Sequence, residues 1–170
     1  MRKAFLLLAG TCIAGIYSFA QEKQDSLRLI NLQEVQVVST RAGVNIPVAY
    51  TNIGKEEIKK QNFGQDIPFL LTLSPSVVAT SDAGAGIGYT NFRIRGTDAT
   101  RINVTTNGIP LNDSESHGVF WVNMPDIASS LEDLQVQRGV GTSTNGAGAF
   151  GASIIMKTEN LSNKASGELS

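Results

Sequence analysis

The single histidine of the chain lies in a polar loop whose side chains could bind a metal ion or take part in catalysis. The loop, Asp113-Ser-Glu-Ser-His-Gly118, spaces its oxygen donors like the first half of a calcium loop, but Met124 stands where calcium needs a bidentate glutamate. Ser, Asp and His also occur together here, yet a catalytic triad needs them in fixed hydrogen-bond geometry. We therefore interpret this segment as a solvated polar loop without a metal.

Two glycine-rich stretches match nucleotide-binding loops in spacing alone. Gly146-Ala-Gly-Ala-Phe-Gly151 has dinucleotide-binding spacing, but a strand-like run follows it where that chemistry needs a helix. Gly141-Thr-Ser-Thr-Asn-Gly146 begins like a phosphate loop, but Ala147 replaces the required lysine. No paired carboxylates and no nucleophile elbow stand out either. We therefore expect no enzyme activity and no cofactor.

Composition excludes further classes. The 170 residues include 14 Lys and Arg against 15 Asp and Glu, so the net charge of -1 argues against a nucleic-acid partner. One Cys excludes a disulfide framework and a Cys-based zinc cluster, and one His excludes a multi-histidine metal centre.

The first twenty residues have the pattern of a secretory signal peptide. A basic start, Arg2-Lys3, precedes an almost wholly apolar run, 4–20, and the sequence then turns abruptly polar. The run is shorter than the ~20 residues that span a bilayer, which disfavours an anchor helix. Lipidation at Cys12 is disfavoured because Thr11 stands where Gly or Ala is expected. We predict export and cleavage after Ala20.

The rest of the chain predicts an α+β fold, with a small mixed β-sheet, short helices and Gly-rich loops. Segments with the pattern of strands are Phe92–Arg95, Ile102–Thr105, Leu134–Arg138 and Ser153–Thr158. Segments that favour helices are Lys55–Gln61, Asp66–Leu73 and a short one from Pro125. Asp66 can cap its helix and Pro68 fits the first turn.

Five motifs, in this order, resemble the plug domain of TonB-dependent outer-membrane transporters. They are Asn91-Phe-Arg-Ile-Arg-Gly96, the turn Asn107-Gly-Ile-Pro110, Glu132 to Gly139, the run Gly146 to Ala152, and the final strand Ile154 to Thr158. Each motif is weak alone, and their common order makes the resemblance specific. Asn145 departs from the family's tyrosine, and Ala152-Ser153 occupies the region of its Gly-Gly pair.

The resemblance implies a domain layout. Residues 1–20 are the signal peptide, 21–40 a flexible segment with a TonB-box-like stretch, 41–160 the plug domain, and 161–170 the start of a connection to a β-barrel that this chain lacks.

The resemblance also implies a function and partners. The plug closes the pore of a 22-stranded barrel in the outer membrane of a Gram-negative cell and faces the periplasm. It couples ligand binding to uptake of a scarce nutrient such as a ferric siderophore, haem or cobalamin. The implied partners are the periplasmic domain of the motor protein TonB, the plug's own barrel, and a small-molecule or metal-chelate ligand.

Site residues follow from the resemblance. The segment that contacts TonB is expected at Glu34, Val35, Gln36, Val37 and Val38. Arg95 and Arg138 are expected to anchor the plug to barrel carboxylates. Loops 81–89 and 112–121 are the expected ligand-facing apices, with the candidates Tyr89, Ser114, Glu115, His117, Phe120 and Trp121. The pair Phe120-Trp121 equally fits a core anchor, and the sequence leaves both interpretations open.

Two other classes stay open. A small eight-stranded outer-membrane barrel would need eight alternating strands and two aromatic girdles, for which the chain has too few aromatic residues. A free periplasmic binding module or small enzyme would need a convergent polar site, and none is visible in the sequence.

Overall fold

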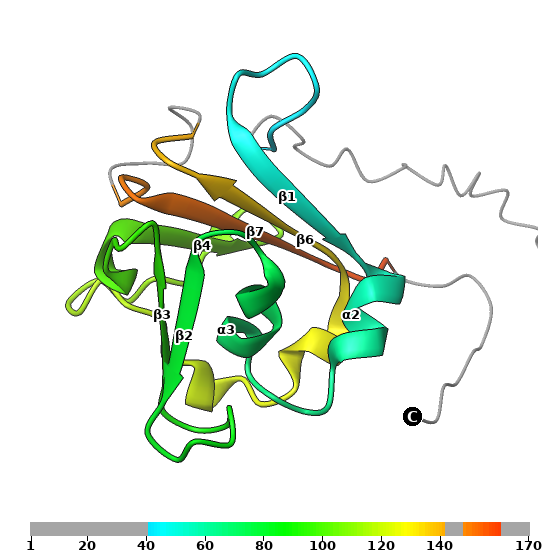
Figure 1. Cartoon of the computed structure of the whole chain (residues 1–170), viewed down its shortest axis with the longest axis vertical. Helices are drawn as coiled ribbons and strands as arrows, with labels where there is room; N and C mark the ends of the chain where they lie inside the picture. Colours follow the sequence, from blue (N-terminus) through cyan, green and yellow to red (C-terminus); the bar gives the residue numbers. More distant parts are fainter. Residues whose placement is uncertain (1–40, 142–147, 161–170) are drawn as a thin grey trace, which may run out of the picture. The chain divides into compact units, whose positions relative to one another are not determined.

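The computed structural model describes residues 41–141 and 148–160. The predicted signal peptide, the expected TonB-contacting residues Glu34 to Val38 and the stretch 161–170 lie outside the described residues. In chain order the elements are β1 (Ala49–Gly54), α2 (Lys55–Gln61), α3 (Ile67–Leu70), the 3-10 turn η3 (Leu71–Leu73), β2 (Val77–Ser81), β3 (Thr90–Ile94), η4 (Ala99–Arg101), β4 (Ile102–Thr106), β5 (Ile109–Pro110), η5 (Trp121–Asn123), η6 (Ile127–Ser130), β6 (Leu131–Arg138) and β7 (Ala152–Thr158) (Figure 1).

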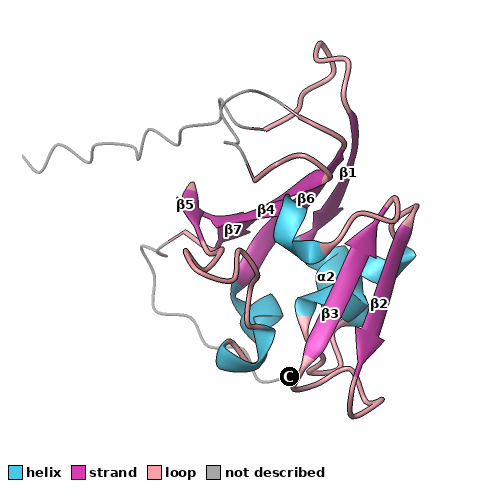
Figure 2. Cartoon of the chain, turned by 90° about the vertical axis from the view of Figure 1, so that its left-hand side faces the viewer, coloured by secondary structure: helices cyan, strands magenta, loops and turns pink. Residues whose placement is uncertain are grey.

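The larger sheet has the strand order β1-β6-β7-β4-β5. All neighbours are antiparallel except β4 and β7, which run parallel. Strands β2 and β3 form a separate antiparallel hairpin, and Figure 2 shows both sheets with the short helices between and below them. This mixed architecture confirms the predicted α+β fold with short helices.

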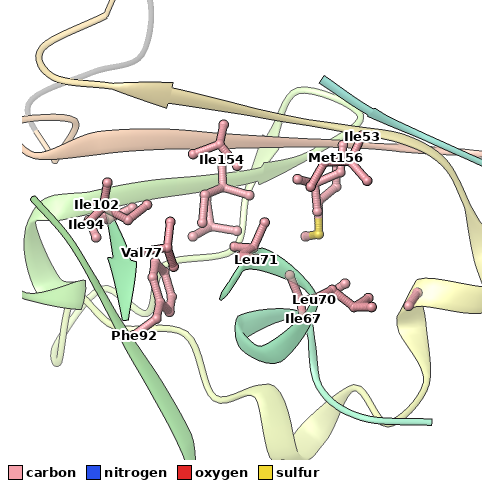
Figure 3. Packing of buried hydrophobic residues seen from close by; sticks show 14 of the residues in the cluster. Ile53, Ile67, Leu70, Leu71, Val77, Phe92, Ile94, Ile102, Ile154 and Met156 are labelled. Carbon is pink, nitrogen blue, oxygen red and sulfur yellow. The ribbon is translucent and has the colours of Figure 1, made fainter. Parts of the chain in front are cut away.

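The core lies on one face of the larger sheet. Leu134 of β6, Met156 of β7 and Ile53 of β1 are in register and share this face. Figure 3 shows Leu71 pointing toward the sheet beneath Ile154, with the hairpin side chains nearby. The buried cluster comprises Ile53, Ile58, Ile67, Leu70, Leu71, Val77, Phe92, Ile94, Ile102, Val104, Trp121, Ala128, Leu131, Leu134, Val136, Ala152, Ile154 and Met156.

Local predictions at Asp66 and Arg95 differ from the structure. Asp66 occupies the N-cap of α3 but makes no capping hydrogen bond there, because its carboxylate is bound elsewhere. Strand β3 ends at Ile94, one residue before the predicted end, because Arg95 takes a left-handed conformation with φ of 52°. The alternation that would place Arg95 on the same side as Arg93 therefore stops at Ile94.

The helices fit their sequence patterns. The first spans Lys55–Gln61 as predicted, with Ile58 buried, and Pro68 lies in the first turn of α3. In the third region, η6 begins at Ile127 and not at Pro125. Among the described residues, no helix has the length and apolar character needed to cross a membrane.

Candidate functional site

Two loops that are distant in sequence meet at one pocket. The pocket has a volume of about 330 Å³. Its walls come from the β2–β3 loop, the start of η4, and the segment that leads into η5. The lining residues are Asp82, Gly88, Tyr89, Thr90, Asn91, Asp98, Ala99, Thr100, Ser116, Gly118, Val119, Phe120, Trp121 and Val122. This volume lies at the lower end of the range of small-molecule sites.

The β2–β3 loop is fixed from below by Asp66. Its carboxylate accepts a hydrogen bond of 2.8 Å from the Thr90 hydroxyl, and both residues are buried. The backbone N–H of Asp66 donates to the carbonyl of Gly86 at 2.8 Å. The ring of Phe69 lies against Gly86, where an added Cβ would meet ring atoms at 3.0 Å. One buried residue therefore holds both: its carboxylate holds the start of β3 at Thr90, and its backbone N–H holds the β2–β3 loop at Gly86.

The second wall is fixed by Asn112. Its side-chain oxygen accepts from the backbone N–H of Val104 at 2.8 Å, and its amide donates to the carbonyl of Ile102 at 2.9 Å. The side chain thus pairs with β4 much as a neighbouring strand would. The same amide also donates to the carbonyl of His117 at 2.9 Å, which ties the loop tip to the sheet.

Asp113 closes the loop tip. Its carboxylate accepts hydrogen bonds from the backbone N–H groups of Glu115 and Ser116 and from the Ser116 hydroxyl. These bonds, with that of the Ser116 backbone first, hold the pKa of Asp113 below its usual value. The side chains of Asp113 and Ser116 thus shape the loop itself.

The charged groups of the pocket wall are carboxylates. Asp98 caps η4, since its side chain accepts from the backbone N–H of Thr100 at 2.9 Å. That bond is the main cause that lowers the pKa of Asp98, and the nearby charges of Arg93 and Arg101 lower it further. Asp98 therefore stays ionised at neutral pH.

The predicted ligand-facing residues divide into three groups. Tyr89 and Phe120 line the pocket with 69% and 51% of their surface exposed. Trp121 also borders the pocket but is 2% exposed, and its ring packs edge-on against Phe92 with centroids 6.1 Å apart. It is thus a core anchor, whereas its neighbour is exposed. The remaining three, Ser114, Glu115 and His117, are exposed on the loop tip outside the pocket lining.

The motifs that contain Gly96, Gly139 and Gly151 meet at another corner of the sheet. The backbone N–H of Gly139 donates to the carbonyl of Gly151 at 2.8 Å, and Gly151 donates in turn to the carbonyl of Arg101 at 2.8 Å. A Cβ on Gly151 would lie 2.5 Å from the Thr97 methyl group, so this position tolerates no side chain without movement.

The predicted anchors Arg95 and Arg138 lie beside this corner. The guanidinium of Arg95 lies 3.4 Å from the place a Cβ on Gly139 would take, and the residue is exposed. Arg138 is half-buried and donates to the Thr51 hydroxyl at 2.7 Å. Within the part of the chain that the structure describes, neither arginine forms an ion pair with a carboxylate.

The sequence does not identify the residues that hold these loops. Its pattern predicts Asp66 as a helix cap and Asn112 as part of a loop. Neither pattern signals a partner 24 or 10 residues away. An asparagine directly after a strand–turn–strand unit, here β4–β5, is a weak signal that could have drawn attention to Asn112.

The chain matches the family model of the TonB-dependent receptor plug domain over residues 42–153. The chain therefore belongs to this family, whose members are domains of transporters and receptors and not enzymes. Plug domains of this family work with a barrel and with ligands. A search of curated protein sequences finds no match.

Solved structures of similar fold include receptors and a transporter. The siderophore receptor PirA from Acinetobacter baumannii has 23% identity and a TM-score of 0.52, covering 68% of this chain and 18% of that one. The ferric yersiniabactin uptake receptor FyuA from Yersinia pestis has 14% identity and a TM-score of 0.50, with coverages of 66% and 17%. The copper transporter OprC has 18% identity and a TM-score of 0.53, with coverages of 72% and 18%.

At these identities the likeness shows the fold. The chain spans less than a fifth of the length of each of these three structures.

Proposed function

We propose that this plug domain is the gate of a TonB-dependent outer-membrane transporter, and that it couples ligand binding to TonB-driven uptake. The observation that carries this proposal is the pocket in which the β2–β3 loop meets the 112–121 loop. A gate needs a ligand-sensing surface that is rigidly joined to its core, and Asp66 and Asn112 provide that connection.

The ligand surface is proposed to include Tyr89 and Phe120, with the exposed loop-tip side chains Ser114, Glu115 and His117 around it. Exposed aromatic rings beside a pocket suit stacking against a flat or cyclic organic ligand. Siderophores, haem and cobalamin all have such parts, and the similar structures include receptors for siderophores. Trp121 contributes from beneath, because it fixes the wall that carries Phe120.

Ligand binding can be tested by truncating the two exposed rings in the receptor assembled with its barrel. Tyr89→Ala with Phe120→Ala should weaken ligand binding by about 5- to 160-fold, since aromatic contacts contribute about 0.5–1.5 kcal/mol each beyond their burial. Calorimetric titration with candidate chelates measures the effect. Phe63→Ala is the matched control, because Phe63 is 85% exposed and lies outside the pocket. Unchanged affinity in the double variant would show that the pocket does not bind the ligand.

The anchoring role of Arg95 and Arg138 is also a proposal. Arg95 is exposed, lies beside Gly139, and lacks an ion-pair partner among the described residues, as expected of a side chain that pairs with another domain. Arg–carboxylate contacts that become buried are costly to break from one side, about 3–5 kcal/mol.

Arg95→Ala should therefore loosen the plug in the assembled transporter. The expected result is faster entry of a large antibiotic that does not cross the intact outer membrane, measured by growth inhibition. Lys60→Ala removes an exposed positive charge from α2 and should leave entry unchanged. Equal entry in Arg95→Ala and wild type would count against the anchoring role.

Contact with TonB is proposed for Glu34 to Val38, which precede the described residues. The alternation of this stretch suits the addition of an extended strand to a partner sheet, in which main-chain hydrogen bonds supply affinity and alternate side chains set the register.

A further inference from the structure

The face of β6 that points away from the core binds the chain shortly before β1 begins. Asp133 forms an ion pair with Arg41, and Gln135 bonds to the backbone of Ala42. Asp133, Gln135 and Gln137 are two residues apart and share this face of the strand. Arg41 and Ala42 are therefore attached to β6. This attachment is separate from the pairing of β6 with β1, which begins only at Ala49.

The bond between Gln135 and Ala42 is specific. The side-chain oxygen of Gln135 accepts from the Ala42 N–H at 2.8 Å and from the Gln137 amide at 2.9 Å. Its side-chain nitrogen donates to the Ala42 carbonyl at 3.0 Å and to the Asn52 oxygen at 2.7 Å. An amide offers two donors and two acceptor lone pairs, so every position is filled.

Because both partners are buried, breaking the bonds between Gln135 and Ala42 is energetically unfavourable. Gln135 is 1% exposed, and Ala42 is buried as well. If Ala42 leaves, the Gln135 amide keeps one donor and one acceptor without a partner inside the protein, which is unfavourable. The Gln135 side chain thus holds Ala42 through the backbone N–H and carbonyl that a neighbouring strand would otherwise bind.

We propose that Arg41, Ala42, Asp133 and Gln135 form a clasp that holds the N-terminal segment and passes tension from that segment to β6 before β1 is loaded. A pull on residues before Arg41 meets the clasp first, since residues 43–48 separate it from β1. The source of the tension rests on the proposed function, in which TonB pulls this segment. The clasp itself is a property of the chain alone.

Strand β6 is well placed to receive such a load. It pairs with β1 on one side and with β7 on the other, and it ends at Arg138, a proposed barrel anchor, next to Gly139, against which the other proposed anchor Arg95 lies. One strand therefore joins the attachment of the N-terminal segment to the corner where the plug is proposed to meet its barrel. Tension delivered to β6 would reach that corner without first removing β1 from the sheet.

Tryptic cleavage after Arg41 in the whole purified chain tests the clasp without any partner. Cleavage requires this segment to detach, so the wild type should be cut slowly and Gln135→Leu about 10- to 100-fold faster, the factor for losing one buried hydrogen-bonded contact. Glu132→Gln is the matched control, because it removes an ion pair with Lys157 from the same strand and should leave the rate unchanged. Equal rates for the wild type and Gln135→Leu overturn the proposal.

Cleavage after Arg101 in the same digest reports loosening of the whole fold. If Gln135→Leu raises cleavage at both sites, Asp133→Asn decides the matter, since Asp133 is half-buried and its loss perturbs the fold less. A rise confined to Arg41 in that variant supports the clasp, and an unchanged rate overturns it.

Pulling single molecules tests the load path. One handle is placed at residue 160, and the other either at residue 30 or at Val44→Cys, which lies beyond the clasp and is exposed. The upstream handle should give an early rupture that lengthens the chain by up to roughly 20 Å, as residues 43–48 extend at about 3.3–3.6 Å each. That rupture should be absent with the handle at residue 44, and it should occur at lower force in Gln135→Leu, which keeps only the Arg41–Asp133 ion pair. Its absence from the wild type contradicts the clasp, while TonB binding, measured separately, is unaffected by this outcome.

Discussion

At the scale of single residues, the glycine corner is set by close approach of backbone to side chain. Gly151 and Thr97 are in contact at a distance that leaves no room for a Cβ. Gly148, three residues earlier, faces open space. The two glycines therefore look alike in the sequence but differ in what they tolerate.

Gly151→Ala should lower the free energy of unfolding by about 1–3 kcal/mol, because the new methyl group overpacks against Thr97. Urea denaturation measures the change. Gly148→Ala should be close to neutral. Adding Thr97→Gly to Gly151→Ala should recover part of the loss in a double-mutant cycle. Equal and small effects of both alanine variants would show that the corner is not tightly packed.

A second residue-scale feature is the carboxylate that joins α2 to η6. Asp126 accepts hydrogen bonds from the side chains of Asn62 at 3.0 Å and Ser129 at 2.7 Å. These bonds, that of Asn62 first, lower the pKa of Asp126 from 3.8 in the folded state. A lowered folded-state pKa means that the ionised group stabilises the fold above its unfolded pKa, and that this contribution disappears as the pH falls through the folded pKa.

Asp126→Asn should remove this acid-sensitive contribution while keeping the left-handed backbone, which Asn tolerates. The difference in unfolding free energy between wild type and variant should therefore be present near neutral pH and shrink in acid. Denaturation curves collected across the acid range measure it. If the difference in unfolding free energy stayed constant or grew in acid, the charge of the Asp126 carboxylate would not be the source of the stabilisation.

At the scale of elements, the β2–β3 hairpin depends on one buried polar contact beneath the pocket. Thr90→Val removes the hydroxyl that donates to Asp66 and keeps the shape of the side chain. It should destabilise the fold by about 1–3 kcal/mol, because the buried carboxylate loses its partner. Thr80→Val is the control, since Thr80 is exposed on the same hairpin.

Both threonine variants can be measured by urea denaturation and by ligand affinity of the assembled receptor. Thr90→Val should lower the affinity as well as the stability, because the loop that carries Tyr89 is released. If Thr90→Val and Thr80→Val had equal ligand affinity, the contact between Thr90 and Asp66 would not contribute to ligand binding.

The elements themselves were predictable where one face is apolar. Alternation predicted β4 and much of β6, because Val104 and Leu134 lie on the core side, and a continuous strand-like run predicted β7, which is buried on both faces. Strands β1 and β2 were not predicted, since each buries a single large apolar residue, Ile53 and Val77 respectively. Their positions depend on pairing with strands distant in sequence.

Buried polar residues limited the prediction of the site. Gln135 and Gln137 read as the solvent side of an amphipathic strand, yet both are buried. Gln135 is also bound to Ala42, 93 residues away in the chain. A single sequence contains no signal for such a pairing, because any exposed glutamine produces the same alternation.

At the scale of the whole molecule, the order of the motifs carried more information than any one of them. The Ile-Arg-Gly end of β3, the Arg-Gly end of β6 and Gly151 are distant in sequence, and the structure brings them to one corner. These three motifs thus share one packing site, and the order of all five motifs predicts the family that the family model shows. Trp121 and Phe120 differ from these motifs, because nothing in the sequence decides that Trp121 is buried and Phe120 exposed.

We propose that TonB drives this plug domain through its N-terminal segment. Binding of the purified periplasmic domain of TonB to a peptide that spans residues 21–41, measured by calorimetry, tests this. Saturable binding is expected, and it should be lost when Val35→Pro and Val37→Pro remove backbone donors from the added strand. No binding, or equal binding by the proline variant, would contradict it and favour a free periplasmic module.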